Sequence, residues 1–240
     1  MNLTAALRIL QQAGRPDPRS LSEDTDLQIQ GIIDALCDLS MHDGLTGLVN
    51  ATFFHAVLSL EINRSLRTGR TCGLMVIDLD HFKQINDTYG HNTGDVALQA
   101  VALQLKRGLR GMDTAARIGG EEFAIILPEC APVDAIHAAT RIHSVINPLI
   151  VSHGQNSIKL TSSAGLVWTN PNLPVDSTTL LSEADQEMYR AKRAGRGRLC
   201  YASAEPTAIS HQERTALLDL KIEENTDGLR NEKGPSYFDH

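Results

Sequence analysis

Two apolar runs meet at a pair of glycines in the sequence Ala115-Ala116-Arg117-Ile118-Gly119-Gly120-Glu121-Glu122-Phe123-Ala124-Ile125-Ile126-Leu127. Short apolar runs separated by a glycine-containing turn are typical of a β-hairpin. Adjacent glycines permit the positive φ angles that a tight hairpin turn requires, and Pro128 ends the second run. The sequence therefore predicts a hairpin over residues 114–128, with Glu121 and Glu122 directly after the glycines.

Helical and strand-like patterns alternate on both sides of this hairpin. The apolar run Leu74-Met75-Val76-Ile77 predicts a strand that is buried on both faces. The remaining patterns predict strands over 158–168 and 198–202, and helices over 50–68, about 95–109, 132–150 and 176–193. We therefore expect one mixed α/β (α+β) domain over residues 43–202, in which helices wrap a central, mostly antiparallel sheet of about five strands.

The segments outside this domain are short. Residues 1–42 are expected to be helical, and one helix face is marked by Ile29, Ile32, Ile33, Leu36 and Leu39, with Ser22 or Thr25 as its N-cap. This stripe spans only about two heptads, so it is either a dimerisation and signalling helix or a surface that packs on its own domain. Residues 203–240 form a C-terminal tail, for which we expect one helix near 210–222 and poor order after it.

Composition argues against several classes of protein. The chain has 240 residues, and its formal net charge of -7 disfavours binding to nucleic acid or to an anionic membrane. Its four cysteines lie far apart and form no C-x-x-C pair, which argues against a zinc site or a disulfide framework. We find neither a signal peptide nor an apolar run of the roughly 18 residues that a membrane helix needs. The expected location is therefore the cytoplasm.

Two acidic clusters lie beside predicted strands: Asp78 and Asp80 end one strand, and Glu121 and Glu122 begin another. Carboxylates at the ends of neighbouring strands can converge on Mg²⁺, which takes one or two carboxylates together with substrate phosphates. Either cluster alone is equally compatible with solvated surface acids. The presence of two clusters, each beside an apolar run, favours a metal site.

A third group is cationic and comprises Lys192, Arg193, Arg196 and Arg198. Such a group at the end of a helix commonly complements the helix dipole. Beside a metal cluster, the same residues would neutralise a polyphosphate, together with Lys83.

A fourth group is rich in amides and carboxylates and comprises Asn86, Asp87, His91, Asn92 and Asp95. These residues are compatible with a turn that is followed by a helix start near Asp95. They are also compatible with a pocket in which an aspartate and an asparagine bind guanine.

Four motifs, in this order, resemble those of the GGDEF family of diguanylate cyclase domains. The hairpin contains Gly119-Gly120-Glu121-Glu122-Phe123, which is the GGEEF form of the motif that names the family. The other three stretches are Asp43–Asn50, similar to D-x-L-T-x-L-x-N; Asp78–His91, similar to D-x-D-x-F-K-x-I-N-D-x-x-G-H; and Ala184–Arg196, similar to A-D-x-x-x-Y-x-A-K-x-x-G-R. The resemblance covers about residues 42–202 and implies a fold like the palm of nucleotidyl cyclases and polymerases.

The resemblance also implies roles for the matching residues. Mg²⁺ or Mn²⁺ would be held by the carboxylates of Asp78 and Glu121 and by the main-chain carbonyl of Leu79. Glu122 would be the catalytic group that assists deprotonation of the attacking 3′-OH. GTP would be bound by His81, Phe82, Lys83, Asn86, His91, Asp95, Lys192 and Arg196, of which Asn86 and Asp95 would recognise guanine. The resemblance assigns no role to Asp80.

The implied activity is the condensation of two GTP molecules into cyclic di-GMP, with release of two pyrophosphates. A homodimer is expected, because a symmetric product requires two facing sites. One alternative is a catalytically inactive domain that binds GTP or cyclic di-GMP as a receptor, which the intact Asp78, Glu121, Glu122 and Lys192 disfavour. Another is a cyclase that uses ATP or mixed substrates, which Asp95 disfavours because a carboxylate cannot donate to adenine N1.

A regulatory site is implied by Arg110-Gly111-Met112-Asp113. Five residues separate Asp113 from Gly119, as in the R-x-x-D inhibitory site of the family. Arg141 matches a second arginine of that site, where cyclic di-GMP would act as an allosteric product inhibitor. The alternative is an ordinary surface pair between Arg110 and Asp113.

Three positions depart from the family pattern. Ala51 stands where arginine is frequent, and Gly197 stands where asparagine is common. The stretch Ser162-Ser163-Ala164-Gly165 is less apolar than the family's usual strand. None of these positions coincides with a proposed metal or guanine ligand.

Overall fold

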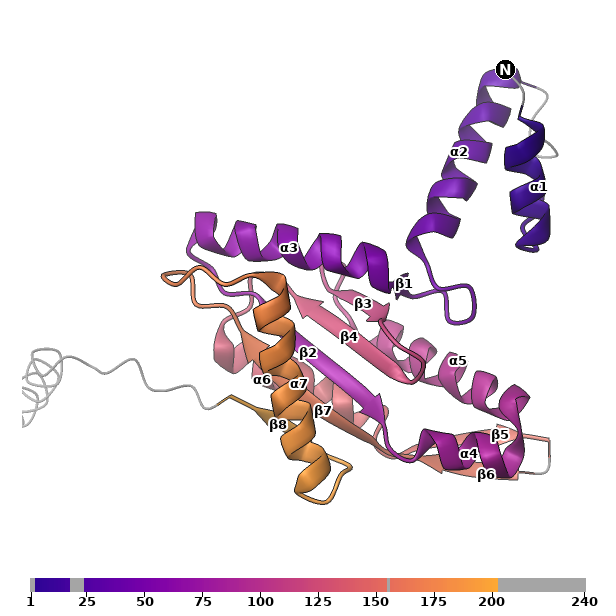
Figure 1. Ribbon diagram of the computed structural model, residues 1–240. Coiled ribbons are helices and arrows are strands. Elements are labelled where there is room, and N and C mark those ends of the chain that lie inside the picture. The colour runs from indigo at the N-terminus through magenta and orange to yellow at the C-terminus, as the bar shows by residue number, and fades with distance from the viewer. Residues whose placement is uncertain (1–2, 18–23, 155, 203–240) are drawn as a thin grey trace, which may run out of the picture. The chain divides into compact units, whose positions relative to one another are not determined.

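The computed structural model describes residues 3–17, 24–154 and 156–202, and Figure 1 shows its helices and strands. The expected cap Ser22 and the expected helix and disorder in the C-terminal tail lie outside these residues. Within them, the central sheet has six strands in the order β1-β3-β4-β2-β7-β8. The mixed α/β fold with a mostly antiparallel sheet is therefore confirmed, and the two-residue strand β1 (Val49–Asn50) adds a sixth strand at one edge.

Strand β2 (Gly73–Leu79) lies at the centre of the sheet, and all seven of its residues are buried. It pairs antiparallel with β4 (Glu122–Leu127) on one side and with β7 (Ser162–Trp168) on the other. Beyond these strands, β3 (Thr114–Arg117) is antiparallel to β4, and β8 (Leu199–Tyr201) is parallel to β7. The continuous apolar run in β2 thus reflects burial on both faces, as the sequence predicts.

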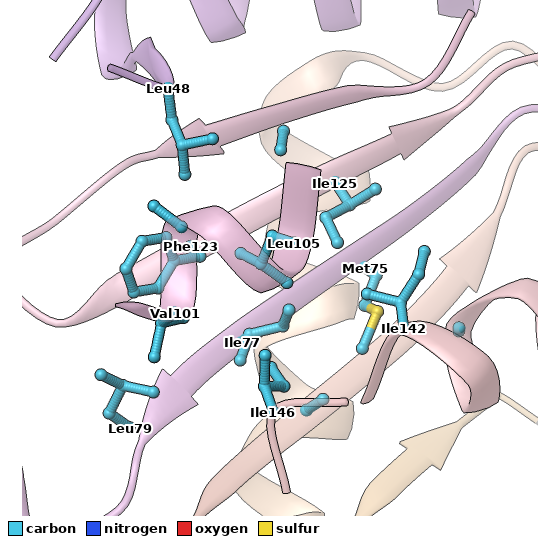
Figure 2. Packing of buried hydrophobic residues seen from close by; sticks show 14 of the residues in the cluster. Leu48, Met75, Ile77, Leu79, Val101, Leu105, Phe123, Ile125, Ile142 and Ile146 are labelled. Carbon is cyan, nitrogen blue, oxygen red and sulfur yellow. The ribbon is translucent and has the colours of Figure 1, made fainter. Parts of the chain in front are cut away.

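Helices cover both faces of the sheet, and the sheet separates two clusters of buried apolar residues. One cluster joins residues of β2 and β4 to α5 (His91–Gly108) and α6 (Pro132–Ser144). Figure 2 shows part of it, in which Leu105, Val101 and Ile142 lie beside Met75 and Ile77 of the central strand. The other cluster joins the opposite face to α3 (Ala51–Thr68) and α7 (Ser177–Arg193).

Two predicted elements have different bounds in the structure. The strand expected over 158–168 is divided at Thr161 into β6 (Asn156–Leu160) and β7, which belong to different sheets. The helix expected over 132–150 ends at Ser144, and β5 (Leu149–His153) then pairs with β6. Pro148 prevents the helix from continuing to residue 150, because proline lacks the backbone donor and the residue before it is disfavoured in a helix.

The N-terminal segment contains α1 (Thr4–Gln12) and α2 (Thr25–Met41). Asp24 caps α2, since its carboxylate accepts from the amide of Asp26 at 2.8 Å, whereas the sequence suggested Ser22 or Thr25. The predicted apolar stripe is divided: Ile32 is buried and α2 contacts α1, whereas Ile33 is 48% exposed.

Candidate active site at the end of strand β2

The two acidic clusters that the sequence singled out lie side by side. In the antiparallel pairing of β2 with β4, Asp78 is opposite Glu122. The amide of Leu79 donates to the carbonyl of Glu121 at 3.3 Å, just beyond the last paired residues. Asp78, Leu79, Glu121 and Glu122 therefore converge at one end of the two strands.

A lysine from α7 completes this cluster. Lys192 Nζ lies 2.9 Å from Asp78 Oδ1, and Asp78 is only 7% exposed. The pKa of Glu121 is raised, first by burial and then by the negative charges of Asp78 and Glu122, while Lys192 opposes the rise. The carboxylates thus repel one another, and a bound cation would relieve that repulsion.

The donor set fits a magnesium ion that is shared with a phosphate ligand. In the part of the chain that the structure describes, no group of three or more His, Cys, Asp or Glu side chains is arranged to hold a metal. Asp78, Glu121 and the carbonyl of Leu79 supply only oxygen donors, which Mg²⁺ prefers. Because Mg²⁺ commonly takes one or two carboxylates and completes its shell with water and phosphate, a smaller protein set is sufficient.

The glycines of the hairpin serve a different purpose from the predicted one. Neither Gly119 nor Gly120 adopts a positive φ, so the expectation of a left-handed turn is wrong. Instead, a Cβ on Gly119 would lie 2.2 Å from Glu122 Oε2. Glycine at this position therefore leaves room for the Glu122 carboxylate to fold back over the turn.

An arginine that sequence reasoning missed holds the hairpin from outside. Arg117 Nε and Nη2 donate to the carbonyl of Gly120 at 3.2 and 2.7 Å, and Nη1 lies 3.3 Å from both carboxylate oxygens of Asp43. Asp43 Oδ1 also accepts from the amide and the hydroxyl of Thr46 at 2.8 and 2.6 Å. Burial alone would raise the pKa of Asp43, but these hydrogen bonds and Arg117 lower it. The feature of the sequence that could have indicated this contact is the position of Arg117, three residues before Gly120.

The second carboxylate of the first acidic cluster, Asp80, does not join Asp78 and Glu121. It is buried and accepts hydrogen bonds from Thr161, Ser163 and Gly197. The sequence offered no signal for this arrangement, because its partners come from distant parts of the chain.

The predicted phosphate-binding residues flank the acidic cluster. His81 has a φ of 58° and precedes α4 (Phe82–Tyr89), so the amides of the first turn of this helix follow β2 almost directly. Phe82 is buried and Lys83 is exposed. Arg196 also has a positive φ, of 60°, in the loop after α7.

The predicted guanine-binding residues come from two consecutive helices. Asn86 lies in α4, and Gly94 of α5 leaves room for it, since a Cβ there would be 1.9 Å from Asn86 Oδ1. His91 and Asp95 are exposed in the first part of α5. The alternative of a turn followed by a helix start near Asp95 is wrong, because Asn86 lies in α4 and α5 begins at His91, with only Gly90 (φ 83°) between the two helices.

The predicted inhibitory residues lie apart from the acidic cluster. The amide of Arg110 donates to Asp113 Oδ2 at 2.8 Å, and Arg141 Nη1 donates to the carbonyl of Gly108 at 2.5 Å. A hollow of about 400 Å³ beside the turn that joins α5 to β3 is lined by residues that include Arg110, Asp113 and Lys106. Arg141 is thereby bound to Gly108, which lies two residues before Arg110 in the chain.

The structure explains two of the three departures from the family pattern. Gly197 has a φ of 56°, which asparagine also tolerates better than other residues with a Cβ. A Cβ on Gly165 would lie 2.1 Å from the carbonyl of Ala184, so glycine allows α7 to approach β7 closely. Nothing in the structure explains Ala51, the first residue of α3.

Comparison with known families identifies most of the described domain. The family described as "Diguanylate cyclase, GGDEF domain" matches residues 40–198. This chain belongs to the GGDEF family. The matched residues contain strands β1 to β7, the acidic cluster and the cationic loop after α7.

Two curated relatives are similar over this region. The response regulator PleD of Caulobacter vibrioides is 36% identical over 191 residues, which are 75% of this chain and 42% of PleD. The probable diguanylate cyclase DgcC of Escherichia coli is 39% identical over 160 residues, which are 67% of this chain and 43% of DgcC. The chain therefore spans less than half the length of these relatives.

Two solved structures show the same fold. The diguanylate cyclase SiaD of Pseudomonas aeruginosa, in complex with its activator SiaC, is 31% identical with a TM-score of 0.67, over 83% of this chain and 74% of SiaD. The coiled coil and GGDEF domain of DgcB from Caulobacter crescentus, in complex with c-di-GMP, is 26% identical with a TM-score of 0.69, over 84% of this chain and all of that chain.

Among the described residues, no helix is both long enough and apolar enough to cross a membrane.

Proposed function

We propose that this chain is a diguanylate cyclase that condenses two GTP molecules into cyclic di-GMP and releases two pyrophosphates. The observation that carries the proposal is the pairing of Asp78 with Glu122 across neighbouring strands, with Lys192 2.9 Å from Asp78. This arrangement supports a site in which carboxylates bind the metal, Glu122 is the base and Lys192 binds phosphate. In our proposal, residues 43–202 form the catalytic domain and residues 1–42 a helical segment that transmits signals or dimerises.

Each group has a distinct part in the proposed reaction. Asn86 and Asp95 bind guanine, while Lys83, Lys192, Arg196 and the amides at the start of α4 bind the triphosphate. Glu122 accepts the proton of the 3′-OH, whose oxygen forms a bond to the α-phosphorus of the second GTP as the bond to pyrophosphate breaks. Mg²⁺ or Mn²⁺, held by Asp78, Glu121 and the Leu79 carbonyl, would stabilise the charge that develops on the phosphates.

The proposed active form is a homodimer with product inhibition. Each chain offers one candidate site, and two facing sites make the two equivalent bonds of the product. Arg110, Asp113 and Arg141 are the proposed inhibitory site for cyclic di-GMP, because a guanidinium fork can bind a phosphate or a guanine edge. The hollow beside Arg110 and the fixed position of Arg141 support this assignment.

The test is the identification of products by mass spectrometry after incubation of the purified chain with Mg²⁺ and either GTP or ATP. We expect cyclic di-GMP from GTP and no cyclic dinucleotide from ATP. Glu122→Gln should lower the rate by about 100-fold or more, because it removes the proton acceptor and keeps the size. The control is Glu183→Gln, which changes an exposed carboxylate on α7. A wild-type chain that binds cyclic di-GMP and makes none would instead be a receptor.

A further inference from the structure

Asp80 is a buried carboxylate that has no part in the proposed chemistry. It follows β2, two residues after Asp78, and is 5% exposed. Its Oδ1 accepts from Ser163 Oγ at 2.7 Å, and its Oδ2 accepts from Thr161 Oγ1 at 2.9 Å and from the amide of Gly197 at 3.0 Å. These charge-assisted bonds join the end of β2, the start of β7 and the loop after α7.

The loop that Asp80 binds has an unusual backbone. Gly195, Arg196 and Gly197 all have positive φ angles, of 106°, 60° and 56°. Arginine disfavours this conformation because of its Cβ, so the surrounding structure must hold it there. Both backbone groups of Gly197 are bound: the amide donates to Asp80, and the carbonyl accepts from Asn147 Nδ2 at 2.8 Å. The restraint therefore acts directly beside Arg196.

We propose that Asp80 is a positioning residue that holds Arg196 in place to bind the GTP triphosphate. The inference rests on the proposed function, in which Arg196 contacts phosphate. Asp78 and Asp80 are separated only by Leu79, at the end of the central strand. The hydrogen bond from Gly197 to Asp80 therefore fixes the position of the cationic loop relative to the Asp78 carboxylate. A cation that is held in its binding geometry loses less conformational freedom when the ligand binds.

The main test measures binding rather than turnover. Calorimetry with a non-hydrolysable GTP analogue and Mg²⁺ gives the Kd of the wild type and of each variant. Asp80→Ala should raise the Kd about tenfold or more, as expected when a supporting hydrogen-bond partner of a binding group is lost. Asp80→Asn keeps an acceptor for the Gly197 amide and should restore affinity close to that of the wild type. Asp134→Ala, which removes an exposed carboxylate of α6, is the matched control.

A double-mutant cycle separates positioning from a general loss of structure. If Asp80 acts through Arg196, Asp80→Ala should add little to the Kd of Arg196→Ala. Two independent, multiplying effects would overturn the proposal, and so would an unchanged Kd in Asp80→Ala. If Asp80→Ala does not fold, Asn147→Ala frees the other side of Gly197 and should raise the Kd in the same Arg196-dependent way. An unchanged Kd in that variant would likewise overturn it.

Activity is measured in parallel on the same proteins. The apparent KM for GTP should rise more than kcat falls in Asp80→Ala, because the lost interaction supports substrate binding. A wild type that binds the analogue and forms no cyclic di-GMP would contradict the proposed function. The binding cycle would still decide the role of Asp80 in that case.

Discussion

Arg117 connects Asp43 to the hairpin that carries Glu121 and Glu122. Its Nη1 atom lies 3.3 Å from both carboxylate oxygens of Asp43, and the rest of its guanidinium binds the carbonyl of Gly120. Asp43 follows His42, the C-cap residue of α2. One partly buried arginine thus joins the segment that follows α2 to the turn that precedes Glu121 and Glu122.

The first prediction is that Arg117→Ala lowers kcat for cyclic di-GMP synthesis by about tenfold or more. The reason is that the turn before Glu121 and Glu122 loses the contact between Arg117 and the Gly120 carbonyl. Arg117→Lys should restore little, because an ammonium group cannot bind the carboxylate and the carbonyl with one planar fork. The measurement is the initial rate at saturating GTP. Arg70→Ala is the control, since the Arg70 side chain is 67% exposed and pairs with Glu129 at the surface. Wild-type kcat in Arg117→Ala would show that the hairpin holds its shape without this contact.

The second prediction concerns Glu121 and pH. Its pKa is raised above the ordinary value of 4.5, first by burial and then by Asp78 and Glu122. The stability that protonated Glu121 contributes is therefore present below pH 4.5 and lost as pH rises through the raised folded pKa. In metal-free buffer near pH 7, Glu121→Gln should unfold about 1–2 °C above the wild type, after allowance for solvent screening.

The check is thermal unfolding of both proteins between about pH 4 and pH 8 with a chelator present. The difference in Tm should vanish at the acid end and be constant above the folded pKa. Glu121→Gln should nevertheless make no cyclic di-GMP, because a metal ligand is gone. A variant that is less stable than the wild type at neutral pH would contradict the repulsion among these carboxylates.

The third prediction concerns the contact between Gly94 and Asn86. A Cβ at residue 94 would lie 1.9 Å from Asn86 Oδ1, so Gly94→Ala should displace this side chain. The KM for GTP should rise about threefold to tenfold, which is the effect of losing one neutral hydrogen bond. Tm should not fall, because alanine stabilises a helix interior by about 1 kcal/mol relative to glycine.

Gly44→Ala is the control for that variant, since a Cβ at residue 44 has no atom within 4 Å. Steady-state kinetics and thermal unfolding of both proteins give the two quantities. An unchanged KM in Gly94→Ala would remove Asn86 from the guanine site.

The sequence by itself determined the central strand, the hairpin and the acidic residues beside them. The apolar run Leu74–Ile77 lies within β2, and the strand ends at Leu79, between the two aspartates of the first acidic cluster. The hairpin of β3 and β4 also forms where the two apolar runs predict it. These features depend on local periodicity and composition, which a single sequence displays directly.

Only the tertiary structure decided how those ends are held together. The sequence placed Asp80 in an acidic cluster without a role, and the fold shows that it binds Thr161, Ser163 and Gly197. Arg117 looked like an ordinary strand residue until the fold placed Asp43 beside it. The physical reason is that such hydrogen bonds join residues far apart in the chain, and their partners become fixed only when strand register and helix packing are set.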